Sequence, residues 1–72
     1  MKKIKKIKIK LNGKIKSIND NYKIQTLLDE LNIPLKKVAI ELNQEILDKK
    51  KLNIIKLKKN DIIEIVHFIG GG

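Results

Sequence analysis

The sequence has no cysteine, no tryptophan and no arginine, and only one proline among its 72 residues. Without cysteine, disulfides, thiol nucleophiles and cysteine-held metals are excluded, and a cytoplasmic location is the simpler expectation. No apolar run approaches the roughly 20 residues that a membrane-spanning helix needs. The basic N-terminal segment also lacks the continuous apolar run of a signal peptide. We therefore expect no membrane association and a core built from aliphatic side chains.

Catalytic side chains are also scarce. A single domain of this size, 1–72, hides only about 60% of the surface of its unfolded chain, which leaves little room for a deep cleft. His67 is the only histidine, and without a second ligand beside it a metal site is not expected. We expect a module with no bound cofactor of its own, on which larger enzymes act.

All 17 basic residues are lysine, and the formal net charge is +9. Such a charge can attract nucleic acid or an anionic membrane. Proteins that bind nucleic acid usually need arginine for bidentate contacts and aromatic side chains for stacking, and this chain has one phenylalanine and one tyrosine. Abundant lysine, isoleucine and asparagine together indicate a compositional bias. We therefore expect no nucleic-acid partner, although the lysines would attract an acidic partner surface.

The first part of the chain predicts a hairpin. Alternating apolar residues indicate a strand over 7–11, and the Asn-Gly pair at 12–13 is a strong hairpin signal. A three-residue loop with a glycine bulge would pair Leu11 with Ile15 and keep both on one face. We favour that loop over a two-residue turn, with a second strand over 15–18.

An amphipathic stripe predicts one helix over 24–31, because apolar residues recur there at i, i+3, i+4 and i+7. Asp20 or Asn21 would cap its start, and Asn32 with Pro34 would end it. The helix has no polar constellation of its own, so we expect it only to cover a sheet.

The second part predicts strands over 38–42, 45–47 and 62–69, with a further extended or helical piece at 54–57. The last strand is the most apolar and is expected at the centre of the sheet. The fold class is therefore α+β, a mixed four- to five-stranded sheet covered on one face by a single helix. Along the last strand, two side chains should face the helix and four should face away: Ile63 and Ile65, against Ile62, Glu64, Val66 and Phe68.

Three glycines follow this strand directly, Gly70, Gly71 and Gly72. Glycine lacks a Cβ, so such a tail can enter a narrow channel and adopt backbone angles closed to other residues. Our hypothesis is that the reactive group of the protein is the carboxylate of Gly72. Residues 70–72 are expected to form a flexible tail, and residues 1–5 a mobile basic leader.

This order of elements, with an aliphatic strand running into Gly-Gly, is similar to the ubiquitin-like β-grasp pattern. More narrowly, the chain resembles the ThiS family, the sulfur carriers of thiamine thiazole biosynthesis. The matching segments are 9–14, 27–31, 38–46 and 60–72, of which the last is the most specific. The sequence departs from the family at three positions: Asn60 and Gln44 replace common glycines, and Lys23 replaces a helix-capping threonine.

The resemblance implies a carrier and not an enzyme. An adenylyltransferase resembling ThiF would use ATP and Mg²⁺ to form an acyl-adenylate at Gly72. A persulfide sulfur donor would convert this to a thiocarboxylate, and a thiazole synthase resembling ThiG would accept the sulfur. Gly70 and Gly71 would keep the arm slim enough for the channel of a partner enzyme.

A docking surface is expected on the face of the sheet that no helix covers. Ile62, Val66 and Phe68 would form an apolar patch there, unless Phe68 folds back over the edge of the core. Two other functions are considered: a small subunit similar to that of molybdopterin synthase, MoaD, and a basic RNA-binding module similar to TGS domains. MoaD proteins tend to be longer, with a proline before the glycines, and the lack of arginine and stacking aromatics argues against RNA.

Overall fold

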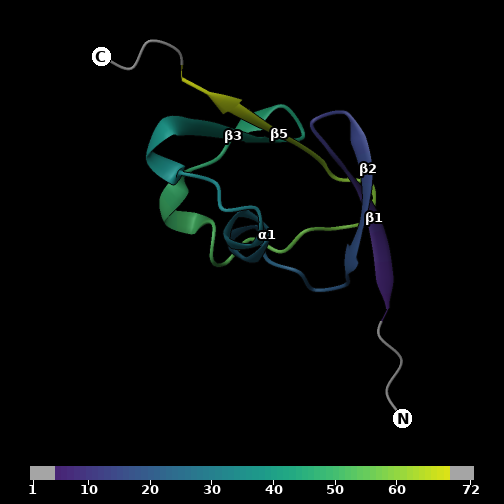
Figure 1. Ribbon diagram of the computed structural model, residues 1–72. Helices are drawn as coiled ribbons and strands as arrows, with labels where there is room; N and C mark the ends of the chain where they lie inside the picture. The colour runs from purple at the N-terminus through teal and green to yellow at the C-terminus, as the bar shows by residue number, and fades with distance from the viewer. Residues whose placement is uncertain (1–4, 69–72) are drawn as a thin grey trace.

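A computed structural model describes residues 5–68, which form a five-stranded sheet with one α-helix against it (Figure 1). The order of strands across the sheet is β2-β1-β5-β3-β4. The elements are β1 (Lys6–Leu11), β2 (Lys14–Asn19), α1 (Ile24–Glu30), the short 3-10 helix η1 (Leu35–Lys37), β3 (Val38–Leu42), β4 (Glu45–Ile46), the 3-10 helix η2 (Lys49–Lys51) and β5 (Ile62–His67). The predicted α+β class is confirmed, with all five strands present.

Strand β5 lies at the centre of the sheet, as its apolar sequence predicted. It pairs in parallel with β1 and antiparallel with β3, so the sheet is mixed. A parallel pair needs a long crossover, and here α1 and the segments after it supply that connection. The last strand of the chain is thereby supported by neighbours on both sides.

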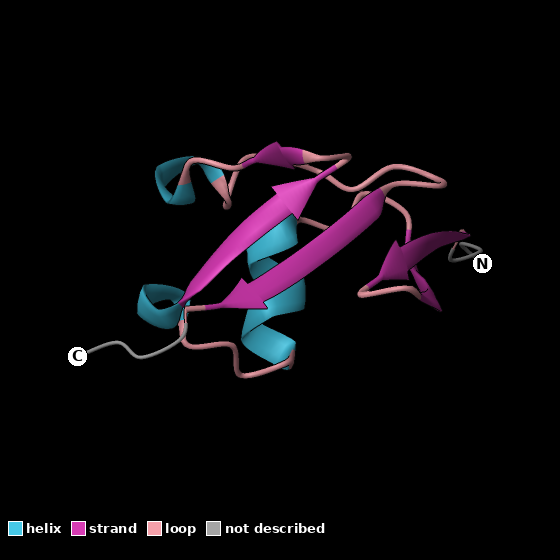
Figure 2. Ribbon diagram, turned by 90° about the horizontal axis from the view of Figure 1, so that it is seen from above, coloured by secondary structure: helices cyan, strands magenta, loops and turns pink. Residues whose placement is uncertain are grey.

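The core lies between α1 and one face of the sheet. Figure 2 shows β3 and β5 crossing in front of the helix, with the other sheet face open. Ile63 and Ile65 are buried against the helix side, as their alternation predicted. Within residues 5–68 the buried core consists of aliphatic side chains alone: Ile9, Ile18, Ile24, Leu27, Leu28, Val38, Ile40, Leu52, Leu57, Ile63 and Ile65.

The first hairpin differs from the prediction. Leu11 pairs with Lys14 across a two-residue turn, and Asn12 and Gly13 both have positive φ, 48° and 82°, as in a type I′ turn. The three-residue loop was wrong, and Ile15 is 72% exposed on the open face. The edge strand accepts this register because lysine at its inner positions can lay its aliphatic stem along the core and keep its ammonium in water.

The start of α1 is also held differently from the expectation. No side chain caps it, and neither Asp20 nor Asn21 is used. Instead, the first amides donate to distant backbone carbonyls, Ile24 N to Ile55 O at 3.0 Å and Gln25 N to Leu52 O at 3.1 Å. The predicted capping was wrong because a segment some 30 residues later satisfies the free amides of the helix.

The end of α1 confirms the prediction. Asn32 has φ of 55°, the left-handed angle of a helix C-terminus. Its amide donates to Asp29 O, and the Ile33 amide donates to Leu28 O, both at 3.1 Å, which are the two bonds of a Schellman motif. The chain therefore leaves the helix in a fixed direction towards η1 and β3.

The remaining differences are small. The strand expected over 45–47 is β4, Glu45–Ile46, and the second strand is β2, Lys14–Asn19. The piece at 54–57 contains one isolated bridge, between Lys56 and Lys23. Of the leader expected over 1–5, residues 1–4 lie outside the described residues, as does the glycine tail, whereas Lys5 O accepts from Asp20 N at 2.8 Å. Within residues 5–68, no helix is long and apolar enough to cross a membrane.

Candidate functional site

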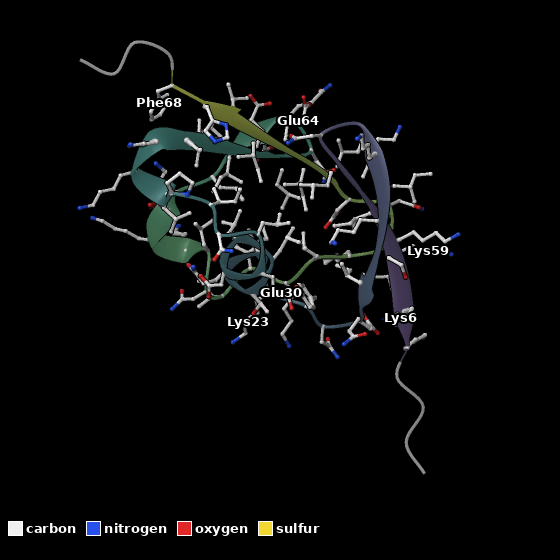
Figure 3. All side chains as sticks on the ribbon, in the orientation of Figure 1. Lys6, Lys23, Glu30, Lys59, Glu64 and Phe68 are labelled. Atoms are coloured by element: carbon white, nitrogen blue, oxygen red, sulfur yellow. The ribbon has the colours of Figure 1, made fainter. Side chains whose placement is uncertain are left out.

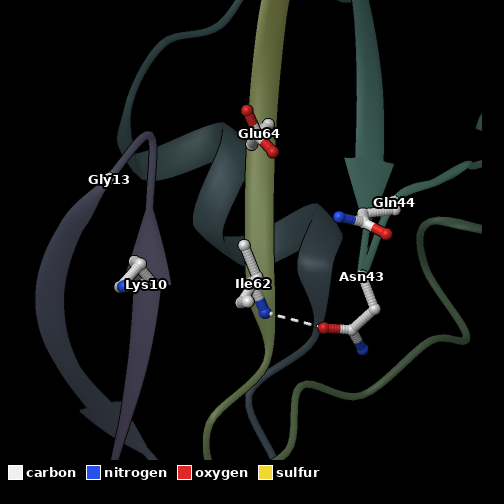
Figure 4. A pocket seen from close by; sticks show the side chains of 6 residues that line it. All are labelled: Lys10, Gly13, Asn43, Gln44, Ile62 and Glu64. Carbon is white, nitrogen blue, oxygen red and sulfur yellow. Dashed lines mark hydrogen bonds between the residues drawn. The ribbon is translucent and has the colours of Figure 1, made fainter.

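The start of β5 is clamped by two asparagines, one from each flanking turn. Asn12 Oδ1 accepts from Ile65 N at 2.8 Å, and Asn12 N donates to Ile63 O at 2.9 Å. On the other side, Asn43 Oδ1 accepts from Ile62 N at 2.9 Å, the bond drawn in Figure 4. The turns of both hairpins thus extend the backbone pairing of the sheet and fix the strand that leads towards the C-terminus.

The turn before β5 is pinned by Asp61. Its carboxylate accepts from Lys58 N at 2.7 Å and from Asn43 Nδ2 at 3.1 Å. Asn60 has φ of 71°, so asparagine here takes a left-handed angle that glycine adopts most readily. The departure at this position therefore leaves the turn geometry intact.

At the other end of β5, Phe68 is the last residue that the structure describes. Its amide donates to Lys37 O at 2.9 Å, which ties it to the end of η1. Lys49 Nζ lies 5.5 Å from the centroid of the Phe68 ring and also donates to Leu35 O. Phe68 remains 58% exposed at the end of the sheet, where Figure 3 labels it.

The face of the sheet opposite α1 exposes apolar side chains, as expected. Ile62 is 40% and Val66 49% exposed on β5. Two further isoleucines share this face and were missed: Ile15, opposite Lys10, and Ile46, opposite Glu41. The sequence placed both isoleucines on strands, but only the strand register set by the turns shows on which face of the sheet each side chain lies.

The glycines that we expect to react, Gly70, Gly71 and Gly72, lie outside the described residues, and their role stays a prediction. Among residues 5–68, no group of three histidine, cysteine or acidic side chains could hold a metal ion. His67 is exposed on β5. The described part of the chain therefore offers a rigid strand and an open face, and the expected chemistry falls on the glycines beyond Phe68.

The clamp at Asn12 gives a stability prediction. Asn12→Gly should lower the free energy of unfolding by about 1–3 kcal/mol, because Ile65 N loses its acceptor while the positive φ remains accessible. At about 4–8 °C per kcal/mol for a domain of this size, the loss is visible in thermal unfolding. Asn12→Asp is the matched control, since it keeps an acceptor oxygen and should retain most of the stability. Equal melting of Asn12→Gly and wild type would contradict the clamp.

Comparison with known proteins decides the family. The family model described as ThiS family matches residues 9–72. The chain belongs to the ThiS family. Its resemblance to the family in sequence is thus confirmed over nearly the whole chain, including the segment beyond Phe68.

Individual relatives agree with this assignment. The sulfur carrier protein ThiS of Bacillus subtilis is 43% identical over 65 residues, which cover 89% of this chain and 98% of that protein. The crystal structure of the thiamine biosynthesis protein ThiS from Geobacter metallireducens superposes with a TM-score of 0.80 at 28% identity, covering 92% of this chain and all of that one. The fold and the family therefore agree, and they favour the sulfur carriers over the MoaD-like and TGS-like alternatives.

A second kind of relative is much longer. The thiazole synthase of Paramagnetospirillum magneticum is 36% identical over 66 residues, and these cover 92% of this chain but only 20% of that protein. The thiazole synthase of Magnetococcus marinus matches to the same extent. The ThiS-family chain thus spans about a fifth of these enzymes, which contain a segment similar to it within a larger polypeptide.

Proposed function

We propose that this chain is a sulfur carrier of thiamine biosynthesis, which supplies the sulfur of the thiazole ring. The observation that supports it most is the 43% identity to a sulfur carrier protein ThiS across almost the full length of both chains. The thiazole synthases with a similar segment support a thiazole-forming enzyme as the acceptor, because in them both parts share one polypeptide.

The reacting group in this proposal is the carboxylate of Gly72. A free α-carboxylate is ionised at neutral pH and is a poor electrophile. It must gain a leaving group before sulfur can replace oxygen, and a ThiF-like adenylyltransferase would attach AMP with ATP and Mg²⁺. The terminal sulfur of a persulfide donor would then displace AMP and form an acyl disulfide. A thiol would cleave the S–S bond of this intermediate, form a disulfide with the donor sulfur and release the thiocarboxylate, which a ThiG-like thiazole synthase would use.

The chain itself acts as a handle and not as an enzyme. Gly70 and Gly71 have no side chains, so the arm can reach an active site through a narrow channel. The sheet supplies the rest of the recognition, with β5 clamped at its start and tied to η1 at its end. We place this chemistry in the cytoplasm because it consumes ATP.

Intact-mass analysis of the protein from its own cells tests the proposal. Cells that grow without added thiamine should contain a fraction of the chain with one oxygen replaced by sulfur. That fraction should disappear when the adenylyltransferase is deleted. A protein that occurs only as the free acid in such cells, with the adenylyltransferase present, would contradict the proposed function.

Docking to the adenylyltransferase gives a second test. Phe68 is exposed at the end of β5, so Phe68→Ala should weaken binding at least tenfold, or about 1.4 kcal/mol, as expected of an aromatic anchor. The melting temperature should change little, because Phe68 is 58% exposed and does not belong to the buried core. Ile54→Ala, at a loop position 68% exposed, is the control and should leave binding unchanged. Parallel losses of affinity and stability in Phe68→Ala would instead favour a structural role at the core edge.

A further inference from the structure

Two glutamates face each other on the open side of the sheet. Glu41 of β3 and Glu64 of β5 are direct partners in the antiparallel register. Ile40 and Ile63, their neighbours along the two strands, are buried on the helix side, so both carboxylates belong to the other face. Figure 3 shows Glu64 on the side of the sheet away from α1. Directly opposite residues have Cβ atoms about 4.5–5.5 Å apart, which places the two carboxylates side by side.

The Glu41–Glu64 pair is unexpected in so basic a chain, and it should lower the stability of the fold. The chain has only eight acidic residues against 17 lysines, yet two of the eight meet on the sheet. Like charges directly opposite each other destabilise a sheet. Of the side-chain hydrogen bonds within residues 5–68, none uses either carboxylate. The structure thus gives the pair no role in holding the fold together.

Apolar side chains surround the two carboxylates. Ile46 lies opposite Glu41 on β4, and Ile62 and Val66 flank Glu64 along β5 on the same face. The side chains of these three residues are all exposed. When a partner covers such apolar side chains they exclude water, and a charged contact between them is strengthened.

A shallow hollow of about 550 Å³ lies beside Glu64 (Figure 4). It is lined by Lys10, Gly13, Asn43, Gln44, Ile62 and Glu64. Gly13 and Gln44 belong to the two tight turns, so the hollow has rigid ends. Lys10 also lines the hollow, beside its register partner Ile62, while Glu64 lies two residues further along β5 with Glu41 directly opposite. A long basic side chain that enters the hollow along Ile62 would reach the Glu64 carboxylate, and Glu41 is the direct neighbour of Glu64 across the two strands.

We propose that Glu41 and Glu64 bind an arginine side chain of the thiazole synthase, with Ile46, Ile62 and Val66 packing against apolar side chains around it. The guanidinium is planar and has five donors, so it can serve two adjacent carboxylates at once. The inference rests on the proposed function, which makes this enzyme the sulfur acceptor. Because the rest of the surface is strongly basic, an acidic centre on one face also fixes the orientation in which the carrier docks.

The test is a titration of the full-length carrier against the thiazole synthase of the same organism. Glu64→Gln keeps the shape and removes one charge, and Glu41→Gln/Glu64→Gln removes both. The double variant should bind at least tenfold more weakly. Its melting temperature should stay the same or rise, because a repulsion has been removed. Added salt should weaken the wild type more than the double variant.

Glu45→Gln is the matched control. It removes one negative charge from β4, but Glu45 lies opposite Leu42 and therefore belongs to the helix-side face of the sheet. Its affinity should equal that of wild type. The proposal is overturned if the double variant binds like wild type, if Glu45→Gln weakens binding as much as Glu64→Gln, or if affinity and melting temperature fall together. A wild-type chain that never gains sulfur in its cells would instead refute the proposed function itself.

Discussion

Replacing the C-terminal carboxylate of Gly72 by a carboxamide should abolish sulfur loading. The amide has no ionised oxygen to attack the α-phosphate of ATP, so the acyl-adenylate cannot form and sulfur has nothing to displace. The measurement is the intact mass of the chain after incubation with the adenylyltransferase, ATP, Mg²⁺ and a persulfide donor. We expect complete loss of the sulfur-containing species and an unchanged melting temperature.

The control for this experiment is the same chain, prepared by the same ligation, with a free carboxylate. Gly71→Leu adds a second comparison, since it keeps the carboxylate and adds only bulk to the arm. It should also fail to load, because a side chain at Gly71 would crowd a narrow channel. Sulfide delivery to a thiazole precursor by the amidated chain would show that the terminal carbon is not the working atom.

Leu27→Ala should produce the largest loss of stability. Leu27 is fully buried in the middle of α1, and removing its side chain leaves a cavity between the helix and the sheet. Such substitutions cost about 2–5 kcal/mol. A domain of this length has roughly 4–11 kcal/mol in total, at about 0.05–0.15 kcal/mol per residue. A urea titration should therefore show that much of the stability is gone.

Leu31→Ala is the matched control, with the same change four residues further along. Leu31 is 37% exposed at the C-cap of α1, so its loss should cost less than about 1 kcal/mol. Below its melting temperature, Leu27→Ala should still be loaded with sulfur, because the helix lies on the side opposite the open face. Equal destabilisation by the two substitutions would contradict the placement of the core.

The elements could be predicted because their signals are local. The stripe of α1 and the alternation along β5 each occupy one short segment, and the structure buries Leu27 and Ile63 accordingly. The first turn and the helix cap could not be predicted in the same way. Asn12 is held in place by Ile65, 53 positions later, and Ile24 donates to Ile55. In both places a partner that is distant in sequence decides between local alternatives of similar cost.

The candidate site likewise has features that follow from local sequence and features that depend on residues distant in sequence. The exposure of Ile62, Val66 and Phe68 followed from alternation on one strand. The addition of Ile46 to this face and the meeting of Glu41 with Glu64 depend on how strands pair, and a single sequence does not give that register. The role of the terminal glycines was inferred from their chemistry and from the family resemblance.

The carbonyls of Leu52 and Ile55 that receive the first amides of α1 link helix formation to the second half of the chain. A seven-residue helix without its own cap is far too short to persist alone in water. Its first turn is satisfied only when residues 52–55 have docked, so we expect the helix and this segment to be gained or lost together. A partly folded carrier that keeps its helix after residues 52–55 have detached is therefore not expected, and the two halves of the chain should unfold in one cooperative step.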